Sequence, residues 1–169
     1  MRHDYVMQTT YLAFYIAKHG GFLDRAISMI DGSPFSHCEL VIKDLGNQCY
    51  DCISSSYHDG GLRRKKIDMS DGHWVLIPVM CDMAHVLRWF NKRQHFKYNY
   101  IGIIRTVIPN FYEPAHFQFC SEACADMLEL VDPGSYGIKK LYEWATQTNI
   151  AKDISKLSSK TPSKLSSKL

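Results

Sequence analysis

Residues 116–128 organise the rest of the chain, and they read His116-Phe117-Gln118-Phe119-Cys120-Ser121-Glu122-Ala123-Cys124-Ala125-Asp126-Met127-Leu128. Before Cys120, polar and aromatic residues alternate, and a period of two is typical of a strand. After Cys120, apolar residues recur at helical spacing, which predicts a helix that begins at Cys120 or Ser121. The segment therefore predicts a strand that passes into a helix, with a cysteine at the junction.

A cysteine at this junction is a candidate nucleophile. The first turn of a helix carries the positive end of the backbone dipole, which favours a thiolate and lowers the thiol pKa. The thiolate is the form that attacks an electrophile, so Cys120 is in a suitable position. The alternative is that Cys120 is a small buried residue without a chemical role, as most buried cysteines are.

The partner that we predict for Cys120 is His37. It lies in residues 35–42, Phe-Ser-His-Cys-Glu-Leu-Val-Ile, which end in a strong strand pattern. On a strand, His37 and Glu39 project from the same face, and Cys38 points into the core. A histidine accepts the proton of a thiol, and a carboxylate orients the ring and stabilises the imidazolium. The backbones of such neighbours lie about 7 Å apart, so a direct bond requires the side chains to lean together.

The remaining pattern predicts a single α+β domain over residues 1–150. Strands are expected at 11–17, 48–54 and 73–80 in addition to 35–42, and helices at 23–30, 82–95 and 139–146. An aromatic turn and an apolar helix are expected over 98–108, followed by a loop at 109–114. The run Arg63-Arg64-Lys65-Lys66 is interpreted as a solvated face rather than a ligand site.

Charge and hydropathy bear on the class of protein. The net charge is +3, and much of it lies in the C-terminal tail, which argues against specific nucleic-acid binding. The longest apolar run, residues 11–17, is too short to span a bilayer, and no small-residue cleavage site follows it. We therefore expect no transmembrane segment and no signal peptide. The six cysteines are then expected to be thiols in a cytoplasmic protein, or in a virion or host cell if the gene is viral.

Residues 151–169 form a low-complexity tail rich in lysine and serine. The tail has too little apolar mass to fold alone, so it is expected to be flexible or bound to a protein partner. It ends in Ser167-Lys168-Leu169, which matches a peroxisomal address. The same triplet occurs twice earlier in the repeat, which favours an accidental match.

Two stretches resemble the active-site motifs of circularly permuted papain-like proteins. Residues 23–42, with a short helix, an Asp-Gly-Ser-Pro turn and the strand that carries His37, resemble their histidine motif. Residues 119–122, Phe-Cys-Ser-Glu, resemble their nucleophile motif. Residues 60–63 and 97–100 fall where such proteins carry a Gly-x-Arg turn and a tyrosine-rich turn. The resemblance spans roughly residues 11–130 and points to the NlpC-type branch with YiiX-like and lecithin:retinol acyltransferase-like members.

This resemblance implies a permuted papain-like fold, in which an antiparallel sheet carrying His37 packs against the helix headed by Cys120. It implies thiol chemistry on an amide or ester without a cofactor, with Glu39 as the orienting residue. The third residue varies between branches of the family. The residues expected to contact the substrate are Tyr98, Tyr100, Gln118 and Ser36.

Other sites remain as alternatives. Cys49, Cys52, Cys120 and Cys124 have a spacing that suits a four-cysteine zinc site. The odd spacing of the first two sends them to opposite faces of a strand, which argues against a metal. His116 is a rival base for Cys120, but four strand residues separate the two by about 13 Å.

The function expected from these observations is a cysteine hydrolase of the peptidase or amidase type. A peptidoglycan peptide is the first substrate, because stand-alone proteins that this chain resembles occur in bacteria and their phages. A thiol acyltransferase or esterase acting on lipid acyl groups is an alternative. A catalytically silent scaffold or virion-assembly protein on the same fold is another.

Overall fold

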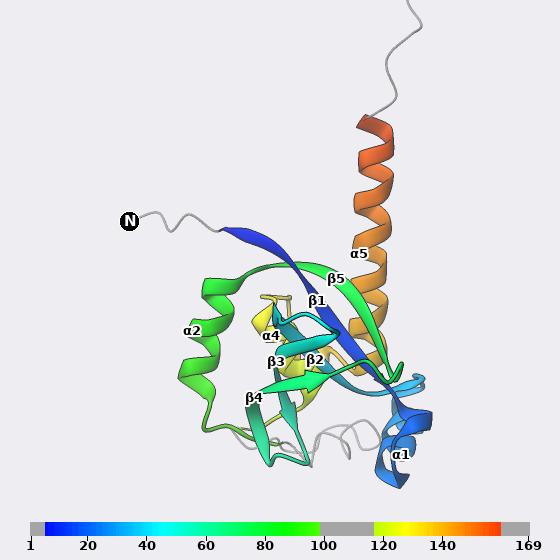
Figure 1. Ribbon diagram of the computed structural model, residues 1–169, viewed down its shortest axis with the longest axis vertical. Coiled ribbons are helices and arrows are strands. Elements are labelled where there is room, and N and C mark those ends of the chain that lie inside the picture. The colour runs from blue at the N-terminus through cyan, green and yellow to red at the C-terminus, as the bar shows by residue number, and fades with distance from the viewer. Residues whose placement is uncertain (1–5, 99–116, 160–169) are drawn as a thin grey trace, which may run out of the picture.

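One mixed sheet forms the centre of an α+β protein (Figure 1). The structure is a computed structural model that describes residues 6–98 and 117–159. The order of strands in the sheet is β5-β1-β2-β3-β4-β6-β7. The first five are antiparallel neighbours, β6 is antiparallel to β4, and β7 runs parallel to β6. The strands are β1 (Met7–Ile16), β2 (Phe35–Asp44), β3 (Cys49–Ser56), β4 (Gly61–Asp68), β5 (Trp74–Asp82), β6 (Lys97–Tyr98) and β7 (Phe117–Gln118).

Capping residues mark the start of α2 and the end of α1. The described helices are α1 (Phe22–Asp31), α2 (Met83–Arg93), α4 (Cys120–Met127) and α5 (Ile138–Ser159), with 3-10 turns η1 (Ala17–His19) and η2 (Pro133–Ser135). The Asp82 carboxylate caps α2 by accepting a 2.9 Å hydrogen bond from the backbone N–H of Ala84. Gly32 ends α1 in the left-handed conformation, with a φ of 64°, which glycine adopts without strain.

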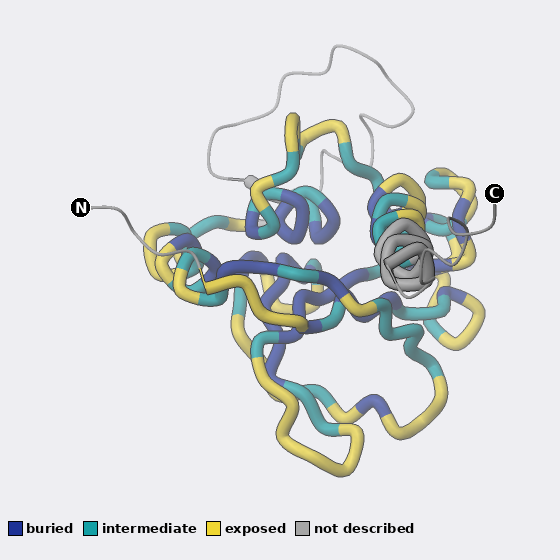
Figure 2. Tube along the Cα trace, turned by 90° about the horizontal axis from the view of Figure 1, so that it is seen from above, coloured by how far each residue is buried: buried dark blue, intermediate teal, exposed yellow. Residues whose placement is uncertain are grey.

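The two faces of the sheet are covered differently. The main core lies on the face toward α4, where Leu12, Phe14 and Leu40 are fully buried against that helix and α5. A smaller apolar cluster on the other face joins Ala13 and Val41 with residues of the neighbouring strands. Figure 2 shows buried residues along the middle of the sheet and α4, with exposed residues at the turns between strands. Helix α4 is thereby held against β2 and β3, which carry the candidate site.

The structure confirms the strands predicted at 11–17, 35–42, 48–54 and 73–80 and the helices predicted at 23–30 and 82–95 as β1, β2, β3, β5, α1 and α2. One strand was not predicted, and one predicted helix is longer than expected. Residues 61–68 form the strand β4, which pairs with β3 along its whole length, whereas the basic run did not predict a strand. Helix α5 runs to Ser159 instead of ending near residue 146, because Ala, Lys, Ile and Leu sustain a helix there. The helix and loop predicted over 99–114 lie outside the described residues.

None of the helices within the described residues combines the length and hydropathy required to cross a bilayer.

Candidate active site

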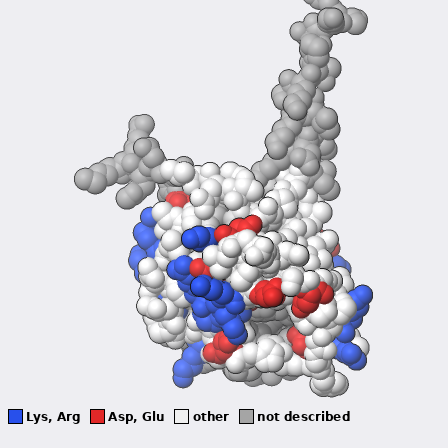
Figure 3. All heavy atoms as spheres, viewed as in Figure 1, with Lys and Arg blue, Asp and Glu red and all other residues white. Residues whose placement is uncertain are grey.

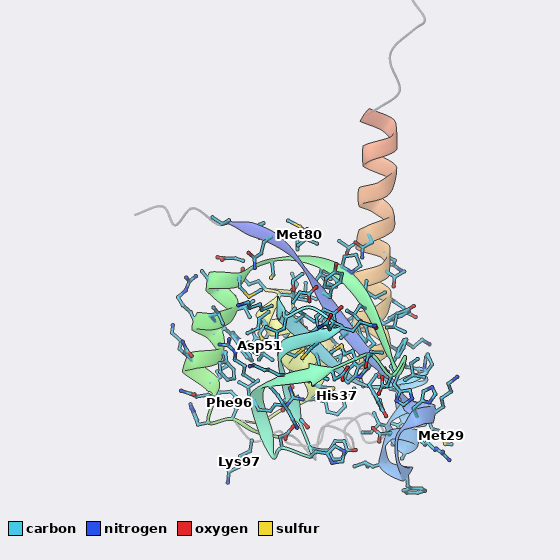
Figure 4. The ribbon with its side chains drawn as sticks, in the orientation of Figure 1. Met29, His37, Asp51, Met80, Phe96 and Lys97 are labelled. Atoms are coloured by element: carbon cyan, nitrogen blue, oxygen red, sulfur yellow. The ribbon has the colours of Figure 1, made fainter. Side chains whose placement is uncertain are left out.

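Strand β2 brings a histidine and a glutamate into direct contact. His37 and Glu39 project from the same face, and the His37 Nε2 atom lies 2.7 Å from the Glu39 Oε1 atom. The two side chains thus lean together as a direct bond requires. Glu39 has no exposed surface, and the His37 side chain is 13% exposed. His37 is labelled in Figure 4.

The charge of Glu39 is matched by Arg63 on β4. The Arg63 Nη1 atom donates to Oε2 of Glu39 at 2.6 Å, and Nη2 donates to Oε1. The Nε atom of Arg63 donates to Asp59 at 2.9 Å, which fixes the guanidinium plane from the other side. A bidentate pair of this kind is the strong form of a charge-assisted hydrogen bond.

The interpretation of residues 63–66 as a solvated face is therefore wrong for Arg63, whose side chain is only 15% exposed. In β4 alternate side chains project from opposite faces, so Arg63 and Arg64 separate. The Arg64 side chain is 48% exposed and binds Asp51 on β3. The Gly-x-Arg turn noted in the sequence was the signal that pointed to Arg63, but only the register with β3 shows its partner.

Helix α4 begins at Cys120, as predicted. The backbone N–H of Phe119, the N-cap residue, donates to the Glu122 carboxylate at 3.3 Å, which fixes the entry of the chain into the helix. The Cys120 side chain is fully buried, against β2. His37 and Cys38 of β2 are the neighbours that lower the pKa of its thiol.

Cys38 lies outside the backbone ladder that joins β2 to β3 and is paired with Phe14 of β1. The ladder between the two strands runs from the Leu40–Ile53 pair to the Asp44–Tyr50 pair. At Cys38, the Ser54 hydroxyl donates to the carbonyl oxygen at 2.6 Å.

The ionisation of Cys120 and His37 is linked. Burial by itself lowers the pKa of His37, but the Cys120 thiolate and the Glu39 carboxylate raise that pKa to about 10. Burial by itself raises the pKa of Cys120, but hydrogen bonds from Cys38 and the positive His37 ring lower it to about 5. These opposite shifts favour the thiolate form of Cys120 and the imidazolium form of His37.

The Glu39 carboxylate remains ionised in this setting. Burial favours its neutral form, but the hydrogen bonds from Arg63 and the charge of His37 lower its pKa. The Arg63 guanidinium is held charged by Glu39 and Asp59, which raise its pKa further despite burial. Because Nε2 of His37 contacts Glu39, Nδ1 is the ring nitrogen left for the Cys120 sulfur. The result is a chain of alternating charges, Cys120–His37–Glu39–Arg63, which we call the charge chain.

A pocket of about 470 Å³ opens beside the charge chain. Its described lining combines three aromatic rings with acidic and basic side chains, and Ile67 is the aliphatic member. In Figure 3, basic and acidic side chains share the face that carries β4 in Figure 1. The lining residues are Tyr15, Asp24, His37, Glu39, Ser56, Tyr57, His58, Asp59, Arg63, Lys65, Lys66, Ile67, Asp68 and Trp74.

The four residues predicted to contact a substrate do not form one group in the described structure. Ser36 is 2% exposed, and its hydroxyl donates to the Asp24 carboxylate at 2.8 Å, so it holds a lining residue of the pocket. Tyr98 and Gln118 lie opposite each other in the β6–β7 pair, next to the start of α4, with their backbones alone described. Tyr100 lies outside the described residues.

The cysteines proposed for a zinc site are divided between the two faces of the sheet. Cys52 belongs to the smaller apolar cluster, whereas Cys120 and Cys124 belong to the main core. All six thiols are free, and the described part of the chain contains no group of three or more side chains arranged to hold a metal. The rival base His116 lies outside the described residues.

Comparison with models of protein families, with curated proteins and with solved structures finds no match to this chain.

Proposed function

We propose that this protein is a cysteine hydrolase in which Cys120 is the nucleophile, His37 the general base and acid, and Glu39 the orienting residue. The observation that carries the proposal is the charge chain, which links a thiol at a helix start to a histidine and a carboxylate. A nucleophile that contacts a base, with the base held by a third group, is the arrangement required for covalent catalysis. Arg63 positions Glu39 and completes the chain.

The geometry supports an acyl-transfer mechanism. The Cys120 thiolate attacks the substrate carbonyl carbon, and the backbone N–H groups in the first turn of α4 stabilise the oxyanion. The His37 imidazolium then gives its Nδ1 proton to the leaving nitrogen or oxygen, which leaves an acyl thioester on Cys120. Neutral His37 next removes a proton from water, which attacks the thioester and releases the thiolate. General acid–base help of this kind contributes about 10²–10⁴-fold to the rate.

The charge chain is difficult to explain by stability alone. Removing an ion pair from water has a desolvation cost that its mutual attraction often fails to exceed, so apolar residues in the same space would be as stabilising. Here the Glu39 and Cys120 side chains have no exposed surface. A buried nucleophile and base whose pKa values are shifted in opposite directions favour a catalytic role.

The pocket favours a peptide over a lipid as the substrate. An acyl chain requires an apolar groove, whereas five charged residues that are at least partly exposed belong to the described lining of this pocket, namely Asp59, Arg63, Lys65, Lys66 and Asp68. A peptide that carries both carboxylates and amines matches a lining with both signs of charge. A peptidoglycan peptide is such a molecule and is the first substrate to test.

The permuted papain-like fold is part of the same proposal. Its support is the chain order, in which the strand that carries His37 precedes the helix headed by Cys120. Its further support is the packing of α4 against β2, the contact that brings the two residues together. Fold likeness does not by itself define a reaction, so the site must carry the functional argument.

The test is selective alkylation followed by a trapped intermediate. Because the Cys120 sulfur is buried, a reagent reaches it through local opening, and iodoacetamide is small enough to follow. We expect Cys120 to be alkylated at pH 6 much faster than the other five cysteines, since a thiolate reacts and a thiol does not. An activated peptide ester should then leave an acyl group on Cys120, seen by peptide mass spectrometry. Uniform slow alkylation of all six cysteines would instead support a scaffold.

A further inference from the structure

Helix α1 turns its apolar side to solvent. Phe22 and Met29 are seven positions apart, so they share one face of the helix, and their exposed fractions are 89% and 84%. Figure 4 shows Met29 on the outer side of α1, away from the sheet. Leu23 and Ile30 flank this face and are 37% and 41% exposed. We call these four residues the α1 face.

The polar side of α1 is the side that packs on the protein. Asp24 is 8% exposed, and its carboxylate accepts a 2.8 Å hydrogen bond from the Ser36 hydroxyl. The Asp31 carboxylate accepts a 2.7 Å hydrogen bond from the backbone N–H of Lys139, at the start of α5. Ile27 is the apolar residue that α1 buries. A surface helix normally buries its apolar stripe, so the reversed orientation of α1 leaves the α1 face for an external partner.

The cationic side chains next to the α1 face lack counter-charges. Lys18 and Arg25 are exposed, and neither forms an ion pair with another described residue. Both line a groove of about 500 Å³, to which Met29, Ile16 and Pro34 also contribute. Figure 3 shows Lys and Arg side chains at the end of the molecule that carries α1 in Figure 1. Two such cations beside an apolar face match a surface of negative charge, such as a bilayer that contains anionic lipids.

The size of the α1 face favours a bilayer over a protein as its partner. A ten-residue helix is about 15 Å long and about 10 Å wide, so the face covers roughly 150 Å². A stable protein–protein interface buries about 800 Å² on each partner, which is several times more. A bilayer does not require such an area, because a few apolar side chains insert between lipids while neighbouring cations attract the headgroups. A symmetric pairing of two copies through this face would bring their Lys18 and Arg25 side chains together, where like charges repel.

We propose that the α1 face docks on a bilayer that contains anionic lipids, with Phe22 and Met29 inserted among the acyl chains and Lys18 and Arg25 on the lipid phosphates. The helix lies parallel to the membrane surface and does not cross it. Asp24, on the opposite side of α1, lines the pocket beside the charge chain, so docking through the α1 face does not cover that pocket. The inference is independent of the proposed function, since no step of it uses the nucleophile.

The test is co-sedimentation of the full chain with lipid vesicles at physiological ionic strength. Vesicles of phosphatidylcholine alone are compared with vesicles of equal parts phosphatidylcholine and phosphatidylglycerol. We expect the wild type to bind the second kind and to bind the first only weakly. Phe22→Ser should weaken binding about tenfold, because one large apolar side chain no longer enters the bilayer. Val131→Ser is the matched control, since Val131 is 90% exposed outside α1, and it should bind like the wild type.

Two further variants locate the contact on the protein. Arg25→Gln should weaken binding to the anionic vesicles about fivefold, whereas Arg64→Gln, at a half-exposed arginine on β4, should not change it. Phe22→Trp should show blue-shifted fluorescence and quenching by brominated lipid when vesicles are added, and Val131→Trp should not. The lysine-rich tail is present in every variant, so its own attraction for anionic lipids does not differ between them.

Three results would overturn the inference. Equal vesicle binding by the wild type and Phe22→Ser would assign the attraction to the tail. The absence of quenching in Phe22→Trp would show that the α1 face does not enter the bilayer. A wild-type dimer that Phe22→Ser converts to a monomer in light scattering would assign the face to a second copy of the chain. Far-UV circular dichroism checks that each variant is folded, and Phe22→Trp decides by a gain of signal if Phe22→Ser does not fold.

Discussion

Arg63 and Arg64 are neighbours on β4, yet they bind carboxylates in opposite settings. Arg63 binds the fully buried Glu39, and its own side chain is 15% exposed. Arg64 binds Asp51 across the β3–β4 pair, and its side chain is 48% exposed. The two arginine–carboxylate pairs should therefore contribute differently to stability, because solvent screens the charge of Arg64 more than that of Arg63.

The comparison indicates which of the two ion pairs should contribute more to the free energy of unfolding. In the Arg64–Asp51 pair the guanidinium is half exposed, whereas Asp51 is only 7% exposed, so water reaches this pair from the arginine side. At the buried pair, loss of Arg63 leaves the fully buried Glu39 carboxylate without the two hydrogen bonds that its guanidinium donates. The predictions below change one member of each pair or of the charge chain, beginning with the largest expected effect.

Replacing Arg63 with alanine should reduce the free energy of unfolding by about 3 kcal/mol or more, because one partner of a buried ion pair is left uncompensated. Urea unfolding followed by circular dichroism measures the change. The double variant Arg63→Ala with Glu39→Gln should recover part of the loss, because the orphaned charge is removed. A loss below 1 kcal/mol for the single variant would contradict the buried character of the pair.

Replacing His37 with alanine should raise the pKa of Cys120 from about 5 toward the value of a free thiol, about 8.5. A lowered thiol pKa means that alkylation increases as pH rises through about 5 in the wild type. In the variant the increase should shift to alkaline pH. The measurement is the pH dependence of iodoacetamide alkylation at Cys120, with His95→Ala on the same chain as a control. Overlapping curves for wild type and His37→Ala would remove His37 from the mechanism.

Replacing Glu39 with glutamine should produce a smaller rise in the Cys120 pKa. The amide keeps the shape and one acceptor, but it removes the charge that stabilises the His37 imidazolium. The same alkylation profile provides the measurement, and the curve should lie between those of wild type and His37→Ala. A curve identical to that of the wild type would show that Arg63 cancels the Glu39 charge at the His37 ring.

Replacing Arg64 with alanine should reduce the free energy of unfolding by less than Arg63→Ala does, because the Arg64 guanidinium is half exposed and Asp51, unlike Glu39, keeps some exposed surface. The Cys120 alkylation profile should not change, since Arg64 does not contact the charge chain. This variant matches Arg63→Ala in residue type, strand and substitution. Equal losses for the two variants would show that the distinction between buried and exposed pairs has no energetic meaning here.

Much of the site was predictable because it depends on local periodicity. The strand alternation around His37 and the helical spacing after Cys120 are properties of neighbouring residues, and the structure confirms both elements. The roles assigned to Cys120, His37 and Glu39 stay predictions. The burial of Arg63 and its pairing with Glu39 were missed because a run of four basic residues has no apolar alternation, and exposure cannot be read from charge alone.

The sequence by itself determined the strand β2 and the helix α4, which carry the site, and the residue at which α4 begins. Hydrophobic periodicity and helix capping depend on residues only a few positions apart, so they can be read from the sequence. Tertiary structure alone decided which side chains meet. The β3–β4 register turned Arg63 toward Glu39 and Arg64 toward Asp51, and the packing of α4 on β2 placed the Cys38 sulfur against that of Cys124. Such contacts join residues 13 or more positions apart, so they follow from how strands and helices pack and not from any local pattern.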